Sequence, residues 1–239
     1  MKKDLYGDNI GKVELVDSLG DDLTVVNSAR VSFGVQKTEL DKKDRKLIKY
    51  LIDHRHTSTL EHCSMTFRFK VPLFVARQHM RHRTWSYNEI SRRYTSHDME
   101  FYEPKEFHTQ SESNRQASNK EELIDPLIDY FHENCGWSGK ASVVVKKHHE
   151  KSLALYNGLL LSGVCREQAR GVLPQNMYTE YYGTVNLNNL FKFIDLRIHE
   201  GAQWEIQQVA KACLNIADKL YPVTVEAYIR REVPRLDSL

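Results

Sequence analysis

An alternating segment that runs directly into a proline and a helical pattern constrains the fold of this chain most strongly. Apolar and polar residues alternate from Met65 to Val71, which predicts a half-buried strand. Pro72 ends this strand and suits the first turn of a helix, which we expect over about 73–83. The apolar residues 74–76 lead straight into a cluster of arginines. Part of that cluster is therefore expected in or beside the core.

The other predicted elements mix strands and helices without a regular βαβ alternation. We therefore predict an α+β fold, with a mixed, largely antiparallel sheet flanked by helices. The 239 residues fit a single domain, because one core can grow to about 250 residues before a chain divides. Polar stretches at 108–122 and 134–140 are expected as surface loops. Strands are expected over 13–16, 23–26 and 176–185, and helices over 39–54, 142–162, 166–173 and 203–220, with a further helix capped by Asn188 or Asn189.

Composition and charge exclude several classes of protein. Apolar residues make up 41% of the chain, and Lys+Arg 34 against Asp+Glu 32 leave a net charge of +2. This excludes a histone-like tail and an acidic disordered chain. No apolar run approaches the ~18 residues of a membrane span, and the first residues lack the apolar stretch of a signal peptide. The four cysteines form no CxxC pair, so we expect a cytoplasmic protein with reduced thiols and no metal site.

The segment 76–94, ARQHMRHRTWSYNEISRRY, carries five arginines and one acid, Glu89. Partly buried guanidinium groups are costly unless an anion pairs with them, and arginine binds phosphate through two parallel hydrogen bonds. The segment therefore predicts a pocket for one or more phosphates. The alternative is a solvated basic face with local acidic partners. The sequence contains no dinucleotide-binding glycine turn, no P-loop and no nucleophile elbow, so arginine side chains would have to hold a nucleotide.

Weaker candidates lie elsewhere in the chain. The histidines at 54, 56 and 62 do not have the HExxH spacing, which favours a structural role over zinc binding. Arg170 lies on a charged helix face that an ordinary salt bridge also explains. Arg197 follows an apolar helical stripe, and its side chain could either reach solvent or face a buried anion.

The arginine segment contains a specific motif. Arg81-His82-Arg83, seven residues and then Ser91 match the RHR-x7-S signature, and the chain resembles the flavin-dependent thymidylate synthases. The neighbouring runs FVARQ at 74–78 and SYNE at 86–89 also fit. The resemblance covers nearly all of the chain except 108–151, with similar segments at 14–17, 29–33, 56–62, 166–170, 196–197 and 202–207.

The resemblance implies a methyl transfer. In this family a methylene group passes from methylenetetrahydrofolate to dUMP, which yields dTMP and tetrahydrofolate. FAD carries the methylene group and supplies the hydride, and NADPH re-reduces the flavin. The resemblance also implies a homotetramer whose active sites lie between subunits.

The same resemblance assigns residues position by position. It implies that Arg197 is the catalytic group that contacts and activates the uracil ring, without a cysteine nucleophile. The implied flavin or folate positions are His56, Ser58, Arg81, His82, Arg83, Glu89, Asn186, Asn188 and Lys192. The implied dUMP positions are Gln78, Arg81, Glu89, Ile90, Ser91, Arg92, Arg93, Arg170 and Arg197.

Two positions depart from the family pattern. Members often carry Asn-x-Arg where this chain has Asn186, Leu187 and Asn188, so one arginine for the flavin phosphates is missing. Lys192 replaces a nearby family asparagine, and we hypothesise that it restores the charge. Arg92 stands where small residues are common, which points to a difference at the mouth of the dUMP site.

Two other functions remain open at this stage. One is a nucleic-acid-binding module that stacks bases on Trp85, Tyr87 and Tyr94. The other is a flavin- and folate-dependent methyltransferase that acts on a base in RNA. The near-neutral charge argues against both, and we expect neither a nucleic-acid nor a membrane partner. Ser91 has no base beside it in the sequence, which favours ligand hydrogen bonding over a nucleophilic role.

Overall fold

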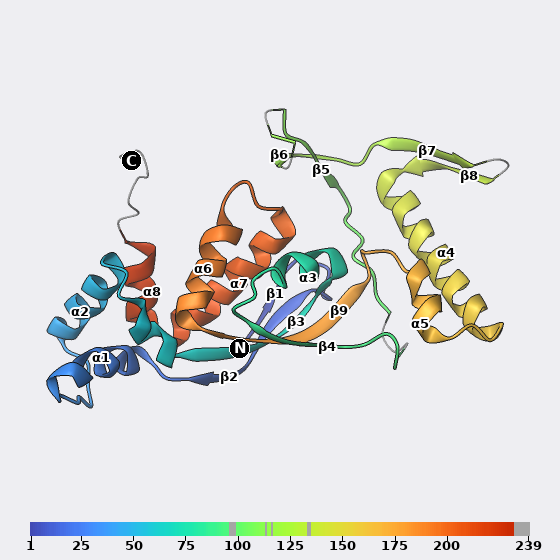
Figure 1. The fold of residues 1–239 in the computed structure, drawn as a ribbon. Helices are drawn as coiled ribbons and strands as arrows, with labels where there is room; N and C mark the ends of the chain where they lie inside the picture. Colours follow the sequence, from blue (N-terminus) through green and yellow to red (C-terminus); the bar gives the residue numbers. More distant parts are fainter. Residues whose placement is uncertain (96–98, 113, 116, 133–134, 232–239) are drawn as a thin grey trace.

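The computed structural model describes residues 1–95, 99–112, 114–115, 117–132 and 135–231, and a five-stranded sheet lies at its centre (Figure 1). The strand order is β1–β2–β3–β9–β4, and every neighbouring pair is antiparallel. The predicted α+β fold with an antiparallel sheet is therefore confirmed. The strands are β1 (Lys2–Asp4), β2 (Lys12–Leu19), β3 (Ser64–Pro72), β4 (Ser86–Glu89) and β9 (Tyr178–Asn186).

Strand β3 is the middle strand, as its alternating pattern predicts. Phe67, Phe69 and Val71 are completely buried on one face, whereas Arg68 reaches the other face and pairs with Glu180 of β9. The register with β9 runs from Ser64 opposite Asn186 to Pro72 opposite Tyr178. This long ladder holds the start of the next helix at a defined edge of the sheet.

Three helices pack against the apolar face of the sheet: α3 (Leu73–His79), α6 (Leu187–Ile198) and α7 (Trp204–Leu220). Helix α3 is shorter than the predicted 73–83, because the chain turns back on itself after His79. Helix α6 is capped by Asn186, whose side chain accepts a hydrogen bond from the Asn189 amide, and not by residue 188 or 189. The cap lies earlier because α6 follows β9 without a loop.

Helices gather at one end of the sheet. They are α1 (Asp22–Arg30), η1 (Val31–Phe33), α2 (Lys42–Asp53), η2 (Thr57–His62) and α8 (Pro222–Ile229). The strand expected over 23–26 is wrong, since these residues lie in α1. The physical reason is a capping box, in which Asp21 and Thr24 bond each other's backbone amides and start a helix.

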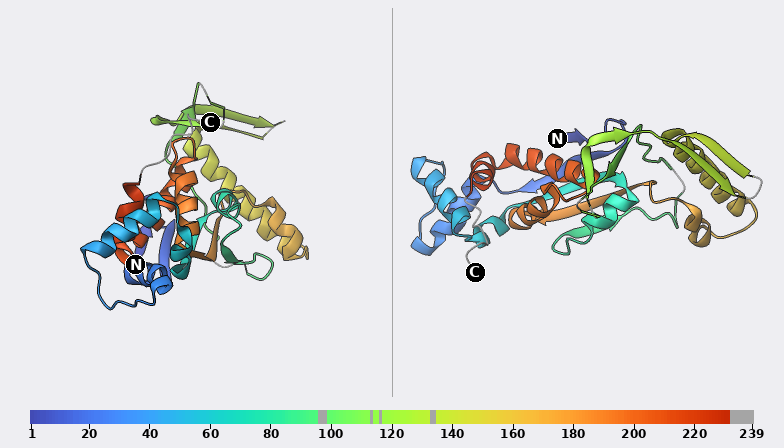
Figure 2. Two further views of the ribbon diagram at one scale, coloured as in Figure 1. Left: turned by 60° about the vertical axis from the view of Figure 1, so that its left-hand side comes forward. Right: turned by 90° about the horizontal axis from the view of Figure 1, so that it is seen from above.

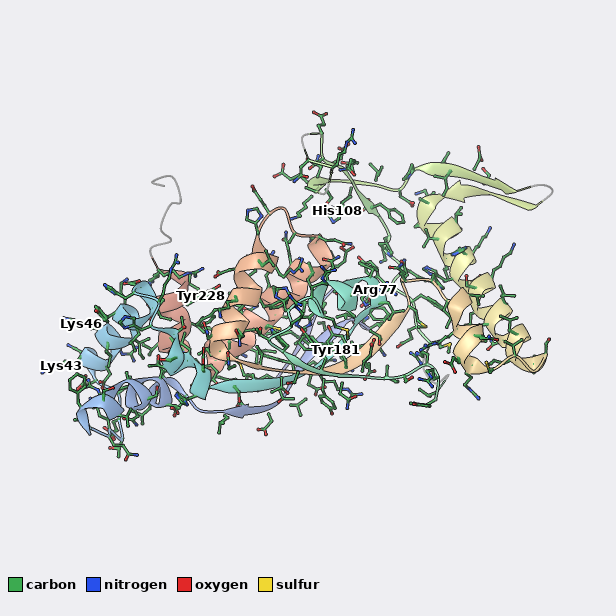
Figure 3. All side chains as sticks on the ribbon, viewed as in Figure 1. Lys43, Lys46, Arg77, His108, Tyr181 and Tyr228 are labelled. Carbon is green, nitrogen blue, oxygen red and sulfur yellow. The ribbon has the colours of Figure 1, made fainter. Side chains whose placement is uncertain are left out.

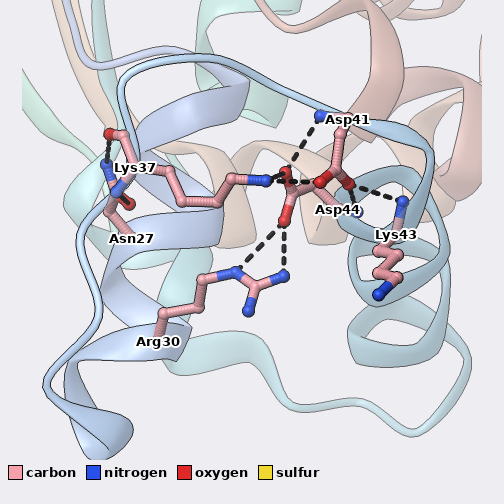
Figure 4. A network of polar contacts seen from close by, with 6 residues as sticks. All are labelled: Asn27, Arg30, Lys37, Asp41, Lys43 and Asp44. Atoms are coloured by element: carbon pink, nitrogen blue, oxygen red, sulfur yellow. Dashed lines mark hydrogen bonds and ion pairs between the residues drawn. The ribbon is translucent and has the colours of Figure 1, made fainter.

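A network of ion pairs joins α1 to α2 (Figure 4). The carboxylate of Asp44 is completely buried, and it accepts hydrogen bonds from Nε and Nη2 of Arg30 at 3.1 and 2.5 Å. Lys37 pairs with both Asp44 and Asp41. Burial alone would raise the pKa of Asp44, but the bonds from Lys37, from the Asp41 amide and from Arg30 hold it below its ordinary value. The network therefore anchors the connection between α1 and α2.

The opposite end of the molecule carries two hairpins and a long helix, so the molecule is elongated (Figure 2). The segments 108–122 and 134–140 are not simply loops, although residues 113, 116 and 134 lie outside the described part. Most of β6 is exposed, so no apolar alternation marks it as a strand. These elements are β5 (Phe107–Gln110), β6 (Ser118–Ile124), β7 (Leu127–His132), β8 (Cys135–Lys140), α4 (Ala141–Leu161), α5 (Arg166–Ala169) and η3 (Arg170–Val172).

Within the described ranges, no helix has the length and apolar content that crossing a bilayer requires.

Candidate functional site

Two successive turns after α3 present the arginine cluster. The His82 amide donates to the His79 carbonyl at 2.9 Å, and the Trp85 amide donates to the His82 carbonyl at 3.3 Å. Arg81 and Arg83 are exposed on these turns, and His82 is partly buried. We call residues 79–85 the double turn. The double turn begins and ends at the buried residues His79 and Trp85, which confirms that part of the arginine cluster lies beside the core.

Arg197 reaches the double turn from the last turn of α6. Its Nε donates to Nε2 of His82 at 3.0 Å, and its Nη2 donates to the carbonyl oxygen of Gln78 at 3.1 Å. Because the Nε of arginine always carries a hydrogen, Nε2 of His82 accepts and the ring proton lies on Nδ1. Residues from two distant parts of the sequence are thus held together, and Arg197 lies against protein groups instead of extending into solvent.

The electrostatics of this group favour an anionic ligand. Burial and the nearby charge of Arg197 lower the pKa of His82 to about 4, so its ring is neutral at pH 7. Burial, together with repulsion from Arg81, lowers the pKa of Arg197. Among the described residues, no carboxylate forms an ion pair with Arg81, Arg83 or Arg197. An anion placed here would relieve the repulsion between Arg81 and Arg197.

A layer of aromatic rings supports the double turn. His79 is completely buried, and its Nδ1 lies 2.9 Å from the hydroxyl of Tyr181 on β9. The His79 ring contacts the rings of Trp85 and Phe193, at centroid distances of 4.4 and 4.6 Å. Figure 3 shows Tyr181 at the level of the sheet, below α3 and its labelled Arg77. The packing of these rings therefore holds the turn against the sheet.

Gly183 of β9 makes room for this layer. A Cβ atom at this position would lie 2.9 Å from the ring of Phe69 and 3.2 Å from the ring of Trp85. Contacts this short would displace the rings, which are themselves buried. The absence of a side chain at residue 183 therefore lets Trp85 pack closely on the strand.

A second group of predicted residues lies where η2 meets the start of α6. The buried amide of Asn188 donates to Glu61 at 2.9 Å, which ties the two elements together. Asn188 and the exposed Lys192 line a cavity of about 250 Å³, together with Thr57 and Arg231. Ser58 and His56 lie in and just before η2 and are exposed.

A third group follows β4. Glu89 accepts a hydrogen bond from Thr179 at 2.6 Å, and the hydroxyl of Ser91 accepts one from the Arg93 amide at 3.3 Å. Arg93 and Arg170 both contact Glu167 of α5. Arg93 forms an ion pair with its carboxylate at 4.0 Å, and Arg170 donates a hydrogen bond to its backbone carbonyl oxygen at 3.3 Å.

Two further residues of the third group, Ile90 and Arg92, face a separate cavity. Ile90 and Arg92 line a small cavity of about 180 Å³ with Arg68 and Lys70. Arg92 is 8% exposed, and its Nη2 lies 3.4 Å from the carbonyl oxygen of Tyr178. Its guanidinium therefore lies in the wall of this cavity.

One chain does not gather all the predicted residues into one place. Arg197 contacts both Gln78 and His82, and Arg93 and Arg170 share a partner on α5. Figure 1 shows α5 at the opposite end of the sheet from α2 and α8, with α3 between them. The second and third groups are therefore separated by the length of the sheet.

Three residues of these groups escaped the sequence-based assignment. Gln203 accepts a hydrogen bond from the Gln78 side chain at 2.5 Å, across 125 positions of sequence. Glu61 holds Asn188, and the hydroxyl of Tyr87 contacts the double turn. The SYNE run includes Tyr87, but a sequence pattern cannot indicate that its hydroxyl reaches backward to the preceding turns.

In the described portion of the chain, no group of three or more His, Cys, Asp or Glu side chains is arranged to hold a metal ion.

Comparison with known proteins supports a family assignment. A family model described as "Thymidylate synthase complementing protein" matches residues 14–223. A flavin-dependent thymidylate synthase of Thermus thermophilus is 44% identical over 218 residues, which cover 91% of this chain and 75% of the relative. One of Thermotoga neapolitana is 42% identical over 227 residues, which cover 92% and 91%. The chain therefore belongs to the flavin-dependent thymidylate synthase family, a family of enzymes.

A solved structure supports the fold. The crystal structure of the UMP/dUMP methylase PolB from Streptomyces cacaoi, bound with 5-Br dUMP, has a TM-score of 0.78 and 34% identity to this chain. The match covers 96% of this chain and 98% of that one. A second structure of PolB, bound with 5-Br UMP, has a TM-score of 0.71 and 35% identity, with 91% and 92% covered.

Proposed function

We propose that this enzyme converts dUMP to dTMP, with methylenetetrahydrofolate as the one-carbon donor, FAD as the flavin and NADPH as the reductant. Family membership supports a flavin-dependent reaction. The observation that carries the proposal is the double turn, where Arg197 contacts the neutral His82 and the adjacent Arg81 and Arg83 are exposed, with no carboxylate ion-pair partner for these three arginines among the described residues. Such a group is suited to phosphate and to an anionic ring.

The double turn is suited to hold the flavin phosphates. Arg81 and Arg83 are exposed and can each offer a planar fork of donors, and the neutral His82 can donate from Nδ1. When it is bound, the flavin supplies the carrier for the methylene group and the hydride. We also assign Ser58, Asn186, Asn188 and Lys192 to the flavin and His56 to the flavin and folate, by their match to the family. The cavity at η2 and α6 adds support for Asn188 and Lys192, which line it.

Arg197 is assigned to the uracil ring. C5 of uracil is a poor nucleophile unless negative charge builds on the ring, and a fixed cation beside the ring stabilises that charge. Arg197 uses Nε and Nη2 for His82 and Gln78, which orients its guanidinium plane and leaves Nη1 on the opposite edge. We assign dUMP contacts to Gln78, Arg81 and Arg197, and to the third group: Glu89, Ile90, Ser91, Arg92, Arg93 and Arg170.

The cysteines whose side chains are described give no support to a nucleophilic mechanism. Burial raises the pKa of Cys63 to about 12, and burial also raises the pKa of Cys213, so both are protonated thiols at pH 7. Cys165 is exposed and precedes Arg166. Ser91 uses its hydroxyl as an acceptor for the Arg93 amide, which supports hydrogen bonding to ligand over attack on it.

We further propose that the enzyme is a homotetramer with active sites between subunits. The family resemblance implies this assembly, and the location of Gln78 and Arg197 at the double turn, with Arg93 and Arg170 in contact with α5, is compatible with it. In such an assembly, the α5 set of one copy could meet the double turn of another copy at a single dUMP molecule. Light scattering should then give four chains per particle, and a monomer that is fully active would contradict the assignment.

The central experiment is an assay of the purified protein. Bound yellow cofactor is expected, as is release of tritium from C5-labelled dUMP in the presence of methylenetetrahydrofolate and NADPH. UMP should be assayed beside dUMP, because the PolB relative is described as acting on both. Colourless protein with strongly salt-dependent RNA or DNA binding would favour a nucleic-acid-binding module. Competition between free dUMP and RNA separates nucleotide methylation from RNA methylation.

Lys192 provides a test of the flavin assignment. If its charge replaces the missing family arginine, Lys192→Ala should weaken FAD binding, because a cation near phosphate is lost. Fluorescence titration of the apoprotein with FAD measures this affinity. Lys46→Ala on α2 removes an exposed lysine without touching the cavity and serves as the control. Unchanged FAD affinity in Lys192→Ala would reject the assignment.

A further inference from the structure

We propose that the hydroxyl of Tyr87 is the positioning group that holds the double turn in its ligand-binding shape. This hydroxyl lies 2.9 Å from the carbonyl oxygen of His79 and 3.1 Å from the carbonyl oxygen of His82. These two oxygens are the acceptors that close the two successive turns. A single side chain therefore contacts both turns at the atoms that define them.

The backbone at this point needs such a contact. The last carbonyl groups of a helix lack partners within the helix, and α3 ends at His79. The His79 carbonyl accepts the His82 amide, and the His82 carbonyl accepts the Trp85 amide at the longer distance of 3.3 Å. Each oxygen has a second lone pair, and the single phenol hydrogen of Tyr87 can be donated to either of them or shared by both. The hydroxyl thus links the two turns, the second of which is closed by the longer bond, into one unit.

Tyr87 is itself held by the sheet. It lies on β4, where it pairs with Gly183 of β9. Its ring is parallel to that of Trp85, with centroids 6.1 Å apart, and it meets the edge of His79 at 5.3 Å. Burial raises the pKa of Tyr87, so its hydroxyl remains protonated and can donate throughout the working pH range. The contact therefore transmits the rigidity of the sheet to the turn.

The proposed role complements that of Arg197. Arg197 holds the imidazole ring of His82, whereas Tyr87 holds the backbone of the same residue. Arg81 and Arg83 flank His82, so the direction of their side chains depends on the backbone that Tyr87 fixes. This inference rests on the proposed function to the extent that these residues bind flavin phosphate. A loosened turn should then weaken flavin binding because ordering it would oppose binding.

The test compares Tyr87→Phe with Tyr181→Phe. Each variant removes one hydroxyl from the same aromatic layer and keeps the ring, but Tyr181 contacts the buried His79 ring and not the carbonyl oxygens of the turn. We expect Tyr87→Phe to raise the flavin Kd about fivefold, the usual worth of one net hydrogen bond. Tyr181→Phe should bind flavin within about twofold of the wild type. Turnover of Tyr87→Phe should recover at saturating flavin.

Amide hydrogen exchange gives a second readout that needs no ligand. The amides of His82 and Trp85 should exchange faster in Tyr87→Phe than in the wild type and should stay protected in Tyr181→Phe. Flavin affinity within twofold of the wild type in Tyr87→Phe overturns the inference, as does equal weakening in both variants. If the wild type binds no flavin, the proposed function fails, and exchange rates that do not distinguish the two variants overturn the role of Tyr87 independently.

Discussion

Replacing Arg197 by lysine separates the geometry of the guanidinium group from its charge. The arginine holds two groups at once, with Nε on the His82 ring at 3.0 Å and Nη2 on the Gln78 carbonyl at 3.1 Å. Lysine keeps one positive charge but has a single nitrogen, so it can reach only one of these positions with good geometry. The variant therefore loses at least one charge-assisted hydrogen bond and the fixed plane of the guanidinium group.

The size of the effect follows from these contacts. A hydrogen bond to a charged group contributes about 1.5–3 kcal/mol, and 1.36 kcal/mol corresponds to a tenfold change in rate. We expect Arg197→Lys to lower kcat for tritium release from dUMP by about 10-fold to 100-fold. The release of His82 from its partner would contribute to the loss, because Arg197 also selects the Nδ1–H form of that ring.

The matched control is Arg30→Lys. Arg30 also uses Nε and Nη2, here on the buried Asp44 carboxylate at the far end of the sheet. The turnover of Arg30→Lys per folded molecule should stay within about twofold of the wild type, whereas the midpoint of its unfolding transition should fall. Both variants should be assayed at saturating dUMP and folate, with the folded fraction measured by circular dichroism. Turnover of Arg197→Lys near that of the wild type would refute the role assigned to Arg197.

Three further predictions concern stability. Gly183→Ala should lower the free energy of unfolding in urea by about 1–3 kcal/mol, because its Cβ would lie 2.9 Å from a buried ring. The control is Gly158→Ala on α4, which has open space at its Cβ and should not destabilise the protein. Equal unfolding midpoints for the two variants would contradict this reasoning. Asp22→Asn should cost about 1–3 kcal/mol, since this buried carboxylate accepts the first amides of α8 at 2.9 Å, and an unchanged melting temperature would count against it. Burial lowers the pKa of His79, and burial with the charge of Arg197 lowers that of His82 to about 4. In the unfolded chain both rings titrate near pH 6.5, so below that pH the unfolded state binds protons that the folded state does not. The free energy of unfolding should therefore be highest above about pH 6.5 and should fall as the pH drops from about 6.5 toward 4. The fall should be less steep in His82→Asn, which has one of the two rings removed.

Local sequence patterns were sufficient for the elements that carry strong periodicity. The alternation of Met65 to Val71 indicated a half-buried strand, and the structure has β3 there with its apolar residues inside. The prediction of a strand over 23–26 is wrong. It followed the short apolar run, whereas the capping box at Asp21 and Thr24 starts a helix there. Strands β5 and β6 were missed because polar, exposed hairpins lack the alternation that burial imposes.

The arginine motif identified the most informative part of the candidate site but not how it is assembled. Its match to RHR-x7-S indicated the family, which the comparisons confirm. The roles assigned to single residues remain predictions. Contacts such as Gln78 with Gln203 and Asn188 with Glu61 join positions more than 100 residues apart, so no spacing in the sequence reports them.

The amino-acid sequence by itself determined the strand β3, the cationic segment after it, the α+β class and the family, because each depends on residues that are neighbours along the chain. Only the tertiary structure decided that Arg197 holds His82, that Tyr87 contacts both turns and that Arg93 pairs with Glu167 of α5. The physical reason is that backbone periodicity is a local property. The partner of a guanidinium or a phenol, by contrast, depends on how separate elements pack across the sheet.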